Sequence, residues 1–346
     1  MSFESITPLQ ARVSIELTFY GGEILELKGA IALLKTCAQV KKDETILIVT
    51  DTNKYEIAKT LADVAISSGF DASIAVMKPR KAHAEDPPRP IISAMRNSDV
   101  IFSPTTFSLF HSCARRDAVQ NGARFVNMAD YSLDMLKEGA LTADFIALKE
   151  LVFKVSDVLT KGSAVRVTTA LGTNIRMDIS GRDAFPQTGM SIKPGESSSP
   201  PNIETCVAPI EGTAEGRILV DGSIPQPRIG LIDEPIELIV RKGFIKEIIG
   251  TGSKVEQLRK IMKGSVGNPN NYNIGELGIG LNPKASFSGK MLEDEGVYGS
   301  VHFGLGDNYS FPGGHTRAEV HIDAIVKKPT VFIDDVLLLK DGEIMI

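Results

Sequence analysis

The hydrophobic pattern of the chain changes near residue 160, and this change constrains the fold more than any other feature. Before it, short apolar runs alternate with segments whose apolar residues have helical spacing. That order is typical of βα units that build a parallel sheet. After it, β-branched residues alternate with polar ones, and glycine and proline are frequent. The sequence therefore predicts two domains of different class, over residues 1–160 and 161–346.

The first part is expected to be an α/β domain with a parallel, doubly wound sheet of the flavodoxin-like or Rossmann-like kind. Its clearest unit is the apolar run 45–50, followed by N-cap candidates at 51–53 and a helical pattern that Gly69 ends. It contains no glycine-rich dinucleotide or phosphate motif, so we interpret it as scaffold. Further strands are expected at 72–77, 100–102 and 124–126, with a helix around 107–120 and a proline-rich loop at 80–90.

The second part is expected to be a mostly antiparallel, β-rich α+β domain that follows a helix over about 142–159. One further helix is predicted at 255–262. The low-complexity stretch 193–202 reads as a mobile loop, because strand-like sequence continues on both sides. The candidate strands are 164–169, 174–179, 216–220, 236–240, 244–249 and 318–326.

The last of these strands carries the strongest chemical signal. Side chains alternate along a strand, so Glu319, His321 and Asp323 share one face, while the apolar residues between them share the other. An imidazole nitrogen and a carboxylate oxygen projecting together suit Zn, Mn, Co or Fe. A solvent-facing polar edge is the alternative that this segment alone leaves open.

A second histidine lies on a strand-like segment just upstream. His302 alternates with Val301 and Phe303, and therefore opposes the apolar face. Two histidines and a carboxylate from neighbouring strands form the smallest ligand set of a catalytic metal. His315, in a Gly-Gly-His turn, is interpreted as a loop residue instead of a ligand.

Two acidic residues stand in apolar surroundings. Glu276 lies in a glycine-rich apolar run, and Glu204 lies beside the low-complexity stretch 193–202. Each carboxylate either lies in water at a strand end or is buried with a cation that balances its charge, because an unpaired buried charge is costly.

Composition limits the partners and the kind of metal site. The 3 cysteines lie far apart without C-x-x-C spacing, so any metal must be held by imidazole and carboxylate. A net charge of −5 without a basic block predicts no nucleic-acid or membrane partner. We expect a cytoplasmic protein, because the sequence shows neither a leader pattern nor a run of about 18 apolar residues.

With these motifs in order, the sequence resembles the thermophilic metalloaminopeptidase family of aminopeptidases T and S. The resemblance covers mainly residues 164–335, about half of the chain. It is carried by Asn202, Glu204, Ala208, Pro209, Glu215 and Gly216, by Glu276 to Gly280 with Asn282 and Pro283, by Leu292 to Glu295 and Gly299 to His302, and by Gly306, Tyr309, Gly313, Gly314, His321 and Asp323.

This resemblance implies a metal-dependent hydrolase, most simply an aminopeptidase that releases N-terminal residues from small peptides or cleaves other amides. It implies a homodimer and two divalent ions, Zn, Co or Mn, which activate a water. Glu204, Glu276 and Tyr309 would also be the catalytic residues, one of the two glutamates as bridging ligand or proton shuttle. The implied metal ligands are Glu204, Glu276, His302, Tyr309, His321 and Asp323.

Two alternatives remain. The chain is more distantly similar to dihydroxypyridine ring-cleaving dioxygenases, which hold one non-haem Fe(II), and the trio of His302, His321 and Asp323 satisfies a 2-His-1-carboxylate set. The dioxygenase pattern has a histidine at the place of Glu276 and none at that of His302, so these two residues favour the hydrolase. The other alternative is a catalytically silent metal-binding or scaffold protein.

Overall fold

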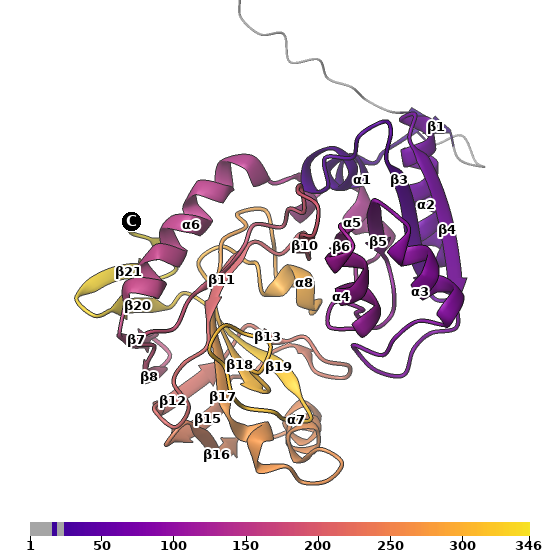
Figure 1. Cartoon of the computed structure of the whole chain (residues 1–346). Helices are drawn as coiled ribbons and strands as arrows, with labels where there is room; N and C mark the ends of the chain where they lie inside the picture. Colours follow the sequence, from indigo (N-terminus) through magenta and orange to yellow (C-terminus); the bar gives the residue numbers. More distant parts are fainter. Residues whose placement is uncertain (1–15, 19–23) are drawn as a thin grey trace, which may run out of the picture.

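The computed structural model describes residues 16–18 and 24–346, and it divides into two parts that lie side by side (Figure 1). The N-terminal part, indigo to purple in Figure 1, is built on a parallel sheet with helices on both faces. The other part consists mainly of antiparallel sheets. The predicted fold class is confirmed, because both kinds of sheet occur in the expected order.

The parallel sheet has the strand order β10-β6-β5-β3-β4. In β3, Ile46 and Ile48 pack into the core beneath α2, while Leu47 and Val49 pack against α3 and α4 on the opposite face. A strand covered on both faces needs apolar residues at every position, which is why the apolar run at 45–50 is unbroken. The elements are β3 (Thr45–Asp51), α2 (Tyr55–Ser67), β4 (Asp71–Met77), α3 (Arg89–Arg96), β5 (Val100–Ser103), α4 (Cys113–Gln120) and β6 (Arg124–Asn127).

Two local predictions in this part need correction. The helix expected around 107–120 begins only at Cys113, because the Ser112 side chain caps it by accepting a hydrogen bond from the Arg115 backbone at 3.1 Å. The preceding residues form a loop that follows β5. The predicted N-cap residues 51–53 do not cap α2, whose N-cap is Lys54 without a side-chain hydrogen bond.

The proline-rich stretch 193–202 is not only a loop. Within it, β10 (Ser197–Ser198) pairs in parallel with β6 and adds a strand to the N-terminal sheet. One hydrophobic cluster also continues from the N-terminal helices into the β-rich part. The chain therefore returns to the first part after residue 160, and the division at that residue stays a prediction.

The β-rich part begins after α6 (Phe145–Lys161) and contains two larger sheets. One has eight strands in the order β16-β15-β12-β8-β7-β20-β21-β22. The other has the order β19-β18-β17-β11-β9 and carries the candidate ligands. The strands of the first are β7 (Ala164–Thr168), β8 (Asn174–Asp178), β12 (Glu215–Val220), β15 (Ile236–Arg241), β16 (Phe244–Ile249), β20 (Thr330–Ile333), β21 (Val336–Lys340) and β22 (Glu343–Ile344).

We call the sheet with the order β19-β18-β17-β11-β9 the ligand sheet. Its strands are β9 (Phe185–Gln187), β11 (Glu204–Val207), β17 (Ile274–Gly280), β18 (Val301–Gly306) and β19 (His321–Val326). The expected strand at 318–326 thus begins only at His321. The remaining elements are β1 (Glu16–Thr18), β2 (Ile24–Glu26), α1 (Lys28–Ala32), a π-helix (Leu33–Cys37), α5 (Leu133–Lys137), β13 (Ser223–Ile224), β14 (Gly230–Leu231), α7 (Ser253–Lys263), α8 (Met291–Asp294) and 3-10 turns at Ala140–Thr142 and Pro269–Tyr272.

Within the described residues, no helix has the length and apolar character needed to cross a membrane. The cytoplasmic location expected from the sequence stays a prediction.

Candidate metal centre

One face of the ligand sheet presents five metal-binding side chains, and each has a glycine directly opposite it on a neighbouring strand. The other face of β17, β18 and β19 is apolar and packs into the core, as the alternation in the sequence predicts. The opposed pairs are Glu204 and Gly280, Glu276 and Gly304, His302 and Gly278, His321 and Gly306, and Asp323 and Gly304.

These glycines leave the space that the donors occupy. A Cβ atom on Gly278 would lie 2.0 Å from Nε2 of His302, and one on Gly304 would lie 2.7 Å from Oε2 of Glu276. Neither distance is possible for non-bonded atoms, so a larger residue would displace the donors. The glycine-rich sequence of β17 and β18 is therefore a requirement of the site.

The donors form two clusters that share Glu276. In the first, Nε2 of His302 lies 3.3 Å from Oε2 of Glu204 and 3.7 Å from Oε1 of Glu276. In the second, Nε2 of His321 lies 3.1 Å from Oε2 of Glu276 and 3.6 Å from Oδ1 of Asp323. Within each cluster, the three ligand atoms lie within 4.8 Å of one another. Glu276 thus turns one oxygen toward each histidine.

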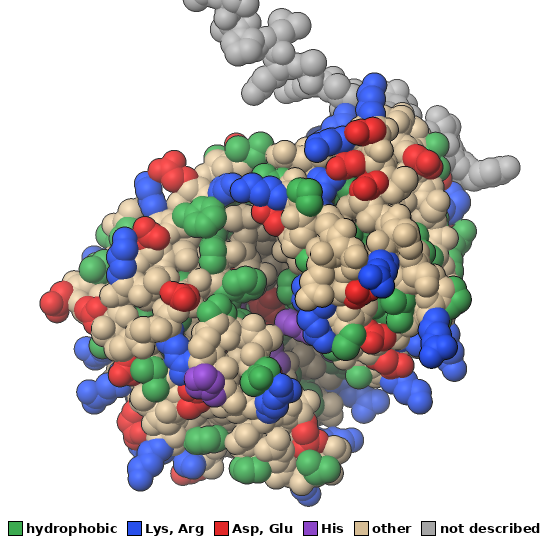
Figure 2. Space-filling model, viewed as in Figure 1, with side chains coloured by type: hydrophobic (Ala, Val, Ile, Leu, Met, Phe, Trp, Pro, Cys, Tyr) green, Lys and Arg blue, Asp and Glu red, His purple; other side chains and the backbone are tan. Residues whose placement is uncertain are grey.

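The two clusters differ in their access to solvent. The His302 and Glu204 side chains are 1% and 2% exposed, whereas that of His321 is 33% exposed. Figure 2 shows histidine and acidic side chains at the floor of a hollow between the two parts of the molecule. His321 therefore makes the cluster of Glu276, His321 and Asp323 the more accessible of the two.

Electrostatics couple the donors strongly. Burial, with the negative charges of Glu276 and Asp323, raises the pKa of Glu204 to about 8. Burial lowers the pKa of both imidazoles, but the carboxylates outweigh it and raise the pKa of His302 to about 9 and that of His321 to about 10. Burial also raises the pKa of Glu276, but hydrogen bonds from both histidines hold it well below its usual range. Without a metal, the imidazoles are therefore protonated and paired with carboxylates.

Buried atoms without partners show that a cation fits here. Oε2 of Glu204 and Oδ1 of Asp323 are buried and make no hydrogen bond. Lone pairs in such a position cost free energy unless a ligand binds them. Imidazole and carboxylate donors on one face suit a divalent metal of the Zn, Mn, Co or Fe kind, and metal binding is supported for this chain.

The structure groups the predicted ligands differently from the sequence interpretation. His302 joins Glu204 and Glu276, and not the trio with His321 and Asp323. Tyr309 lies on the loop after β18; it is 52% exposed, and the Arg317 guanidinium lies 3.6 Å from its ring centroid, so its role as a ligand stays a prediction. His315 lies in the loop between β18 and β19, as predicted, with its side chain exposed.

Three further residues near the site were not among the predicted site residues. The backbone oxygen of Asp307 lies 2.7 Å from Nδ1 of His321, which directs Nε2 of that ring toward Glu276. Glu295 is buried and accepts a hydrogen bond from Asn202 at 3.1 Å; burial and the nearby Asp323 raise its pKa well above the usual range. Glu295 lies in the Leu292 to Glu295 stretch of the family resemblance, but its place near Asp323 depends on strands that are distant in sequence, as does the contact of Asp307.

His111, the third residue, reaches the site from the N-terminal part, on the loop after β5. Desolvation and the positive charge of His321 lower its pKa to about 4, so the ring is neutral at physiological pH. It makes an edge contact with Phe110 at 5.2 Å. The N-terminal part therefore brings one side chain close enough to His321 for their charges to interact.

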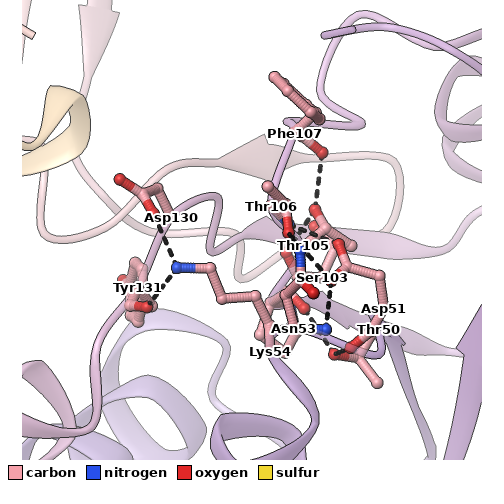
Figure 3. A network of polar contacts seen from close by, with 11 residues as sticks. Thr50, Asp51, Asn53, Lys54, Ser103, Thr105, Thr106, Phe107, Asp130 and Tyr131 are labelled. Carbon is pink, nitrogen blue, oxygen red and sulfur yellow. Dashed lines mark hydrogen bonds and ion pairs between the residues drawn. The ribbon is translucent and has the colours of Figure 1, made fainter. Parts of the chain in front are cut away.

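A second group of buried polar residues lies at the carboxyl ends of β3 and β5 (Figure 3). This edge of a doubly wound sheet commonly binds ligands. Here, however, the Asp51 carboxylate accepts hydrogen bonds from the backbone of Asn53 at 3.0 Å and of Thr106 at 2.6 Å. Lys54 is bound by Asp130 at 2.7 Å and by the Tyr131 carbonyl at 3.0 Å. We call this group the Asp51 network; its polar atoms satisfy one another.

Comparison with known proteins decides between the two families that the motifs suggest. The sequence matches the family of 2,5-dihydroxypyridine 5,6-dioxygenases (NicX) over residues 30–346. The chain belongs to this family. No curated protein matches the sequence.

Solved structures agree with this assignment at the level of the fold. The 2,5-dihydroxypyridine dioxygenase of Pseudomonas putida KT2440 is 20% identical, with a TM-score of 0.78 over 92% of this chain and 97% of that one. AmpT of Thermus thermophilus is 14% identical, with a TM-score of 0.67 over 92% of this chain and 99% of that one. The resemblance to the aminopeptidases thus holds for the fold.

The prediction of an aminopeptidase, with its description as a hydrolase and metalloprotease, is wrong. The preference for a hydrolase over a dioxygenase depended on Glu276 and His302, but the chain shares its fold with a solved structure of each kind. The match to the dioxygenase family extends over nearly the whole chain and points to an oxidoreductase that cleaves a ring.

Proposed function

We propose that this protein is a dioxygenase that opens the ring of a hydroxylated pyridine, with 2,5-dihydroxypyridine as the first substrate to test, and that it binds a single Fe(II). The observation that carries the proposal is the family match over residues 30–346, joined to a donor cluster that faces the hollow between the two parts. Glu276, His321 and Asp323 would hold the iron. When bound, Fe(II) supplies the one-electron chemistry that dioxygen needs to react with an aromatic ring.

The chain's own residues prepare this cluster for a metal and an adjacent substrate. The hydrogen bond between Nδ1 of His321 and the Asp307 carbonyl leaves Nε2 free to bind. His302 and Glu204 form a buried pair behind Glu276, and Nε2 of His302 lies 3.7 Å from the second oxygen of Glu276, Oε1. This pair would fix the orientation of Glu276, so that one carboxylate oxygen remains directed toward His321.

The surroundings of His321 suit a planar ring. Phe311 stacks on the His321 imidazole with a centroid distance of 5.4 Å and an interplanar angle of 29°. His111, neutral at physiological pH, can accept a hydrogen bond from a ring hydroxyl through one of its nitrogens. Aromatic side chains beside the metal would favour a flat heteroaromatic substrate over an extended peptide.

The experiment that tests this function measures oxygen uptake. The protein is loaded with Fe(II) under anaerobic conditions and mixed with 2,5-dihydroxypyridine and ¹⁸O₂. We expect stoichiometric oxygen consumption, a ring-opened product that carries two labelled oxygen atoms, and one iron per chain by elemental analysis. Monohydroxylated pyridines serve as controls for the substrate.

Two results would contradict the proposal. One is an iron-loaded, folded protein that consumes no oxygen with any dihydroxypyridine. The other is a protein that reacts equally well when Zn(II) replaces Fe(II), because zinc has no redox chemistry.

A further inference from the structure

The loop between β18 and β19, residues 307–316, is held from outside the ligand sheet. Glu211, which follows β11, binds both ends of this loop through one oxygen. Its Oε1 accepts a hydrogen bond from Nδ2 of Asn308 at 3.0 Å and another from the backbone nitrogen of His315 at 2.9 Å. The carboxylate therefore ties together two residues that lie on opposite sides of the loop.

Arg182 fixes this carboxylate from the other side. Its Nη2 donates to Oε2 of Glu211 at 2.6 Å, and the Arg182 side chain is only 9% exposed. Burial works to raise the pKa of Glu211, but the hydrogen bonds from Asn308, His315 and Arg182 outweigh it and lower the pKa. Glu211 thus remains ionised, which strengthens all three bonds.

The 307–316 loop makes two contacts with His321, one of the candidate ligands. At its start, the Asp307 carbonyl binds Nδ1 of His321 at 2.7 Å. At its tip, Phe311 stacks on the His321 ring. The first contact sets which nitrogen faces the metal, and the second sets the plane of the ring. Without the loop, the imidazole of His321, the most exposed of the five donors, would be free to rotate.

We propose that Glu211 and Arg182 are positioning residues for His321, acting through the 307–316 loop. The inference rests on the proposed metal site, and it names residues that touch neither metal nor substrate. Partners of this kind orient a metal-binding imidazole, and their loss typically lowers metal affinity about 10–100-fold.

The test uses the full chain and Co(II) alone, whose visible absorption reports ligand geometry. Glu211→Ala removes both loop bonds and the ion pair. We expect Co(II) to bind about 10–100-fold more weakly, with a changed spectrum at saturating metal. Glu211→Gln keeps an acceptor oxygen for Asn308 and His315, and we expect it to recover part of the affinity. Glu215→Ala is the matched control, because Glu215 is exposed and pairs with Arg241 at 3.4 Å away from the donors.

Folded Glu211→Ala protein with the parental Co(II) affinity and spectrum would overturn the proposal. If Glu211→Ala does not fold, Arg182→Met and Glu211→Gln decide it by the same two measurements. Failure of the proposed function is separate: a parent protein that binds Co(II) as expected but consumes no oxygen with dihydroxypyridines contradicts the dioxygenase and leaves the positioning role supported by the Co(II) result.

Discussion

The Asp51 network and the ligand sheet both bury acidic side chains, but they differ in whether the protein donates hydrogen bonds to the carboxylate oxygens. In the network, both oxygens of Asp51 accept hydrogen bonds from the protein. In the ligand sheet, oxygens of Glu204 and Asp323 are buried without any. A polar group that the protein satisfies is structural, whereas one that it leaves unsatisfied needs a ligand. The comparison favours the antiparallel sheet as the candidate metal site, although ligands of doubly wound folds commonly bind at the carboxyl edge of the parallel sheet.

The strongest test of this difference removes a ligand. Asp323→Ala should reduce bound metal to background and lower activity by at least about 100-fold, because a ligand contributes more than the groups that orient it. Far-UV circular dichroism should be unchanged. Metal analysis and oxygen uptake are the measurements, with the exposed Asp335→Ala as control. If activity survives in Asp323→Ala, the site lies elsewhere.

A second test fills the space between the donors. Gly304→Ala places a methyl group 2.7 Å from Oε2 of Glu276 and 2.9 Å from Cε1 of His321. We expect metal affinity to fall about 10–100-fold, as for other changes that misalign ligands. Isothermal titration with Co(II) measures this. Gly267→Ala is the control, because nothing lies within 4 Å of the added Cβ and only the positive φ of 70° makes the substitution strained. An equal loss of metal affinity in both variants would show that the space at Gly304 has no special role for the donors.

The pH dependence of metal binding tests the charge balance of the ligand sheet. His321 has a raised pKa of about 10, so below this value it holds a proton that a metal bound by Glu276, His321 and Asp323 must displace. Apparent affinity should therefore rise with pH between 6.5 and 8.5, by about tenfold per unit for each proton released. Titrations in buffers of different ionisation enthalpy count the protons, and an affinity that is constant with pH would contradict these assignments.

The smallest effect on metal binding is expected from a substitution in the Asp51 network. Asp51→Ala leaves the Asn53 and Thr106 donors without their acceptor, which should cost about 1–3 kcal/mol of unfolding free energy. Metal affinity should stay at the parental value. Urea unfolding and Co(II) titration check the two expectations, again with Asp335→Ala as control. A loss of metal affinity without a loss of stability would show that this network serves the site instead of the fold.

Much of the ligand sheet could be predicted from the sequence. The two-residue period of a strand places His321 beside Asp323, and His302 opposite the apolar Val301 and Phe303. The parallel sheet could be predicted from a different pattern, because a strand covered on both faces, such as β3, is a continuous apolar run. Both inferences rest on local order along the chain. The helix start at Cys113 was missed because the expected helix pattern extended through a loop whose end the Ser112 cap defines.

The grouping of the donors could not be predicted in this way. Which ligand faces which depends on the register of four strands from distant parts of the sequence, and that register joins His302 to Glu204 and Glu276. The choice between hydrolase and dioxygenase failed for a related reason. The chain shares its fold with a solved structure of each kind, and the family match along residues 30–346 separated the two functions.

The sequence by itself determined the chemistry available to this protein: imidazole and carboxylate donors, glycines between them, and no thiolate site. Only the tertiary structure decided how these donors meet, that β10 returns to the first sheet, and that His111 and the 307–316 loop approach His321 from opposite parts of the chain. The physical reason is that side-chain direction follows from neighbours in sequence, whereas strand register and the contacts between the two parts follow from packing across the whole molecule.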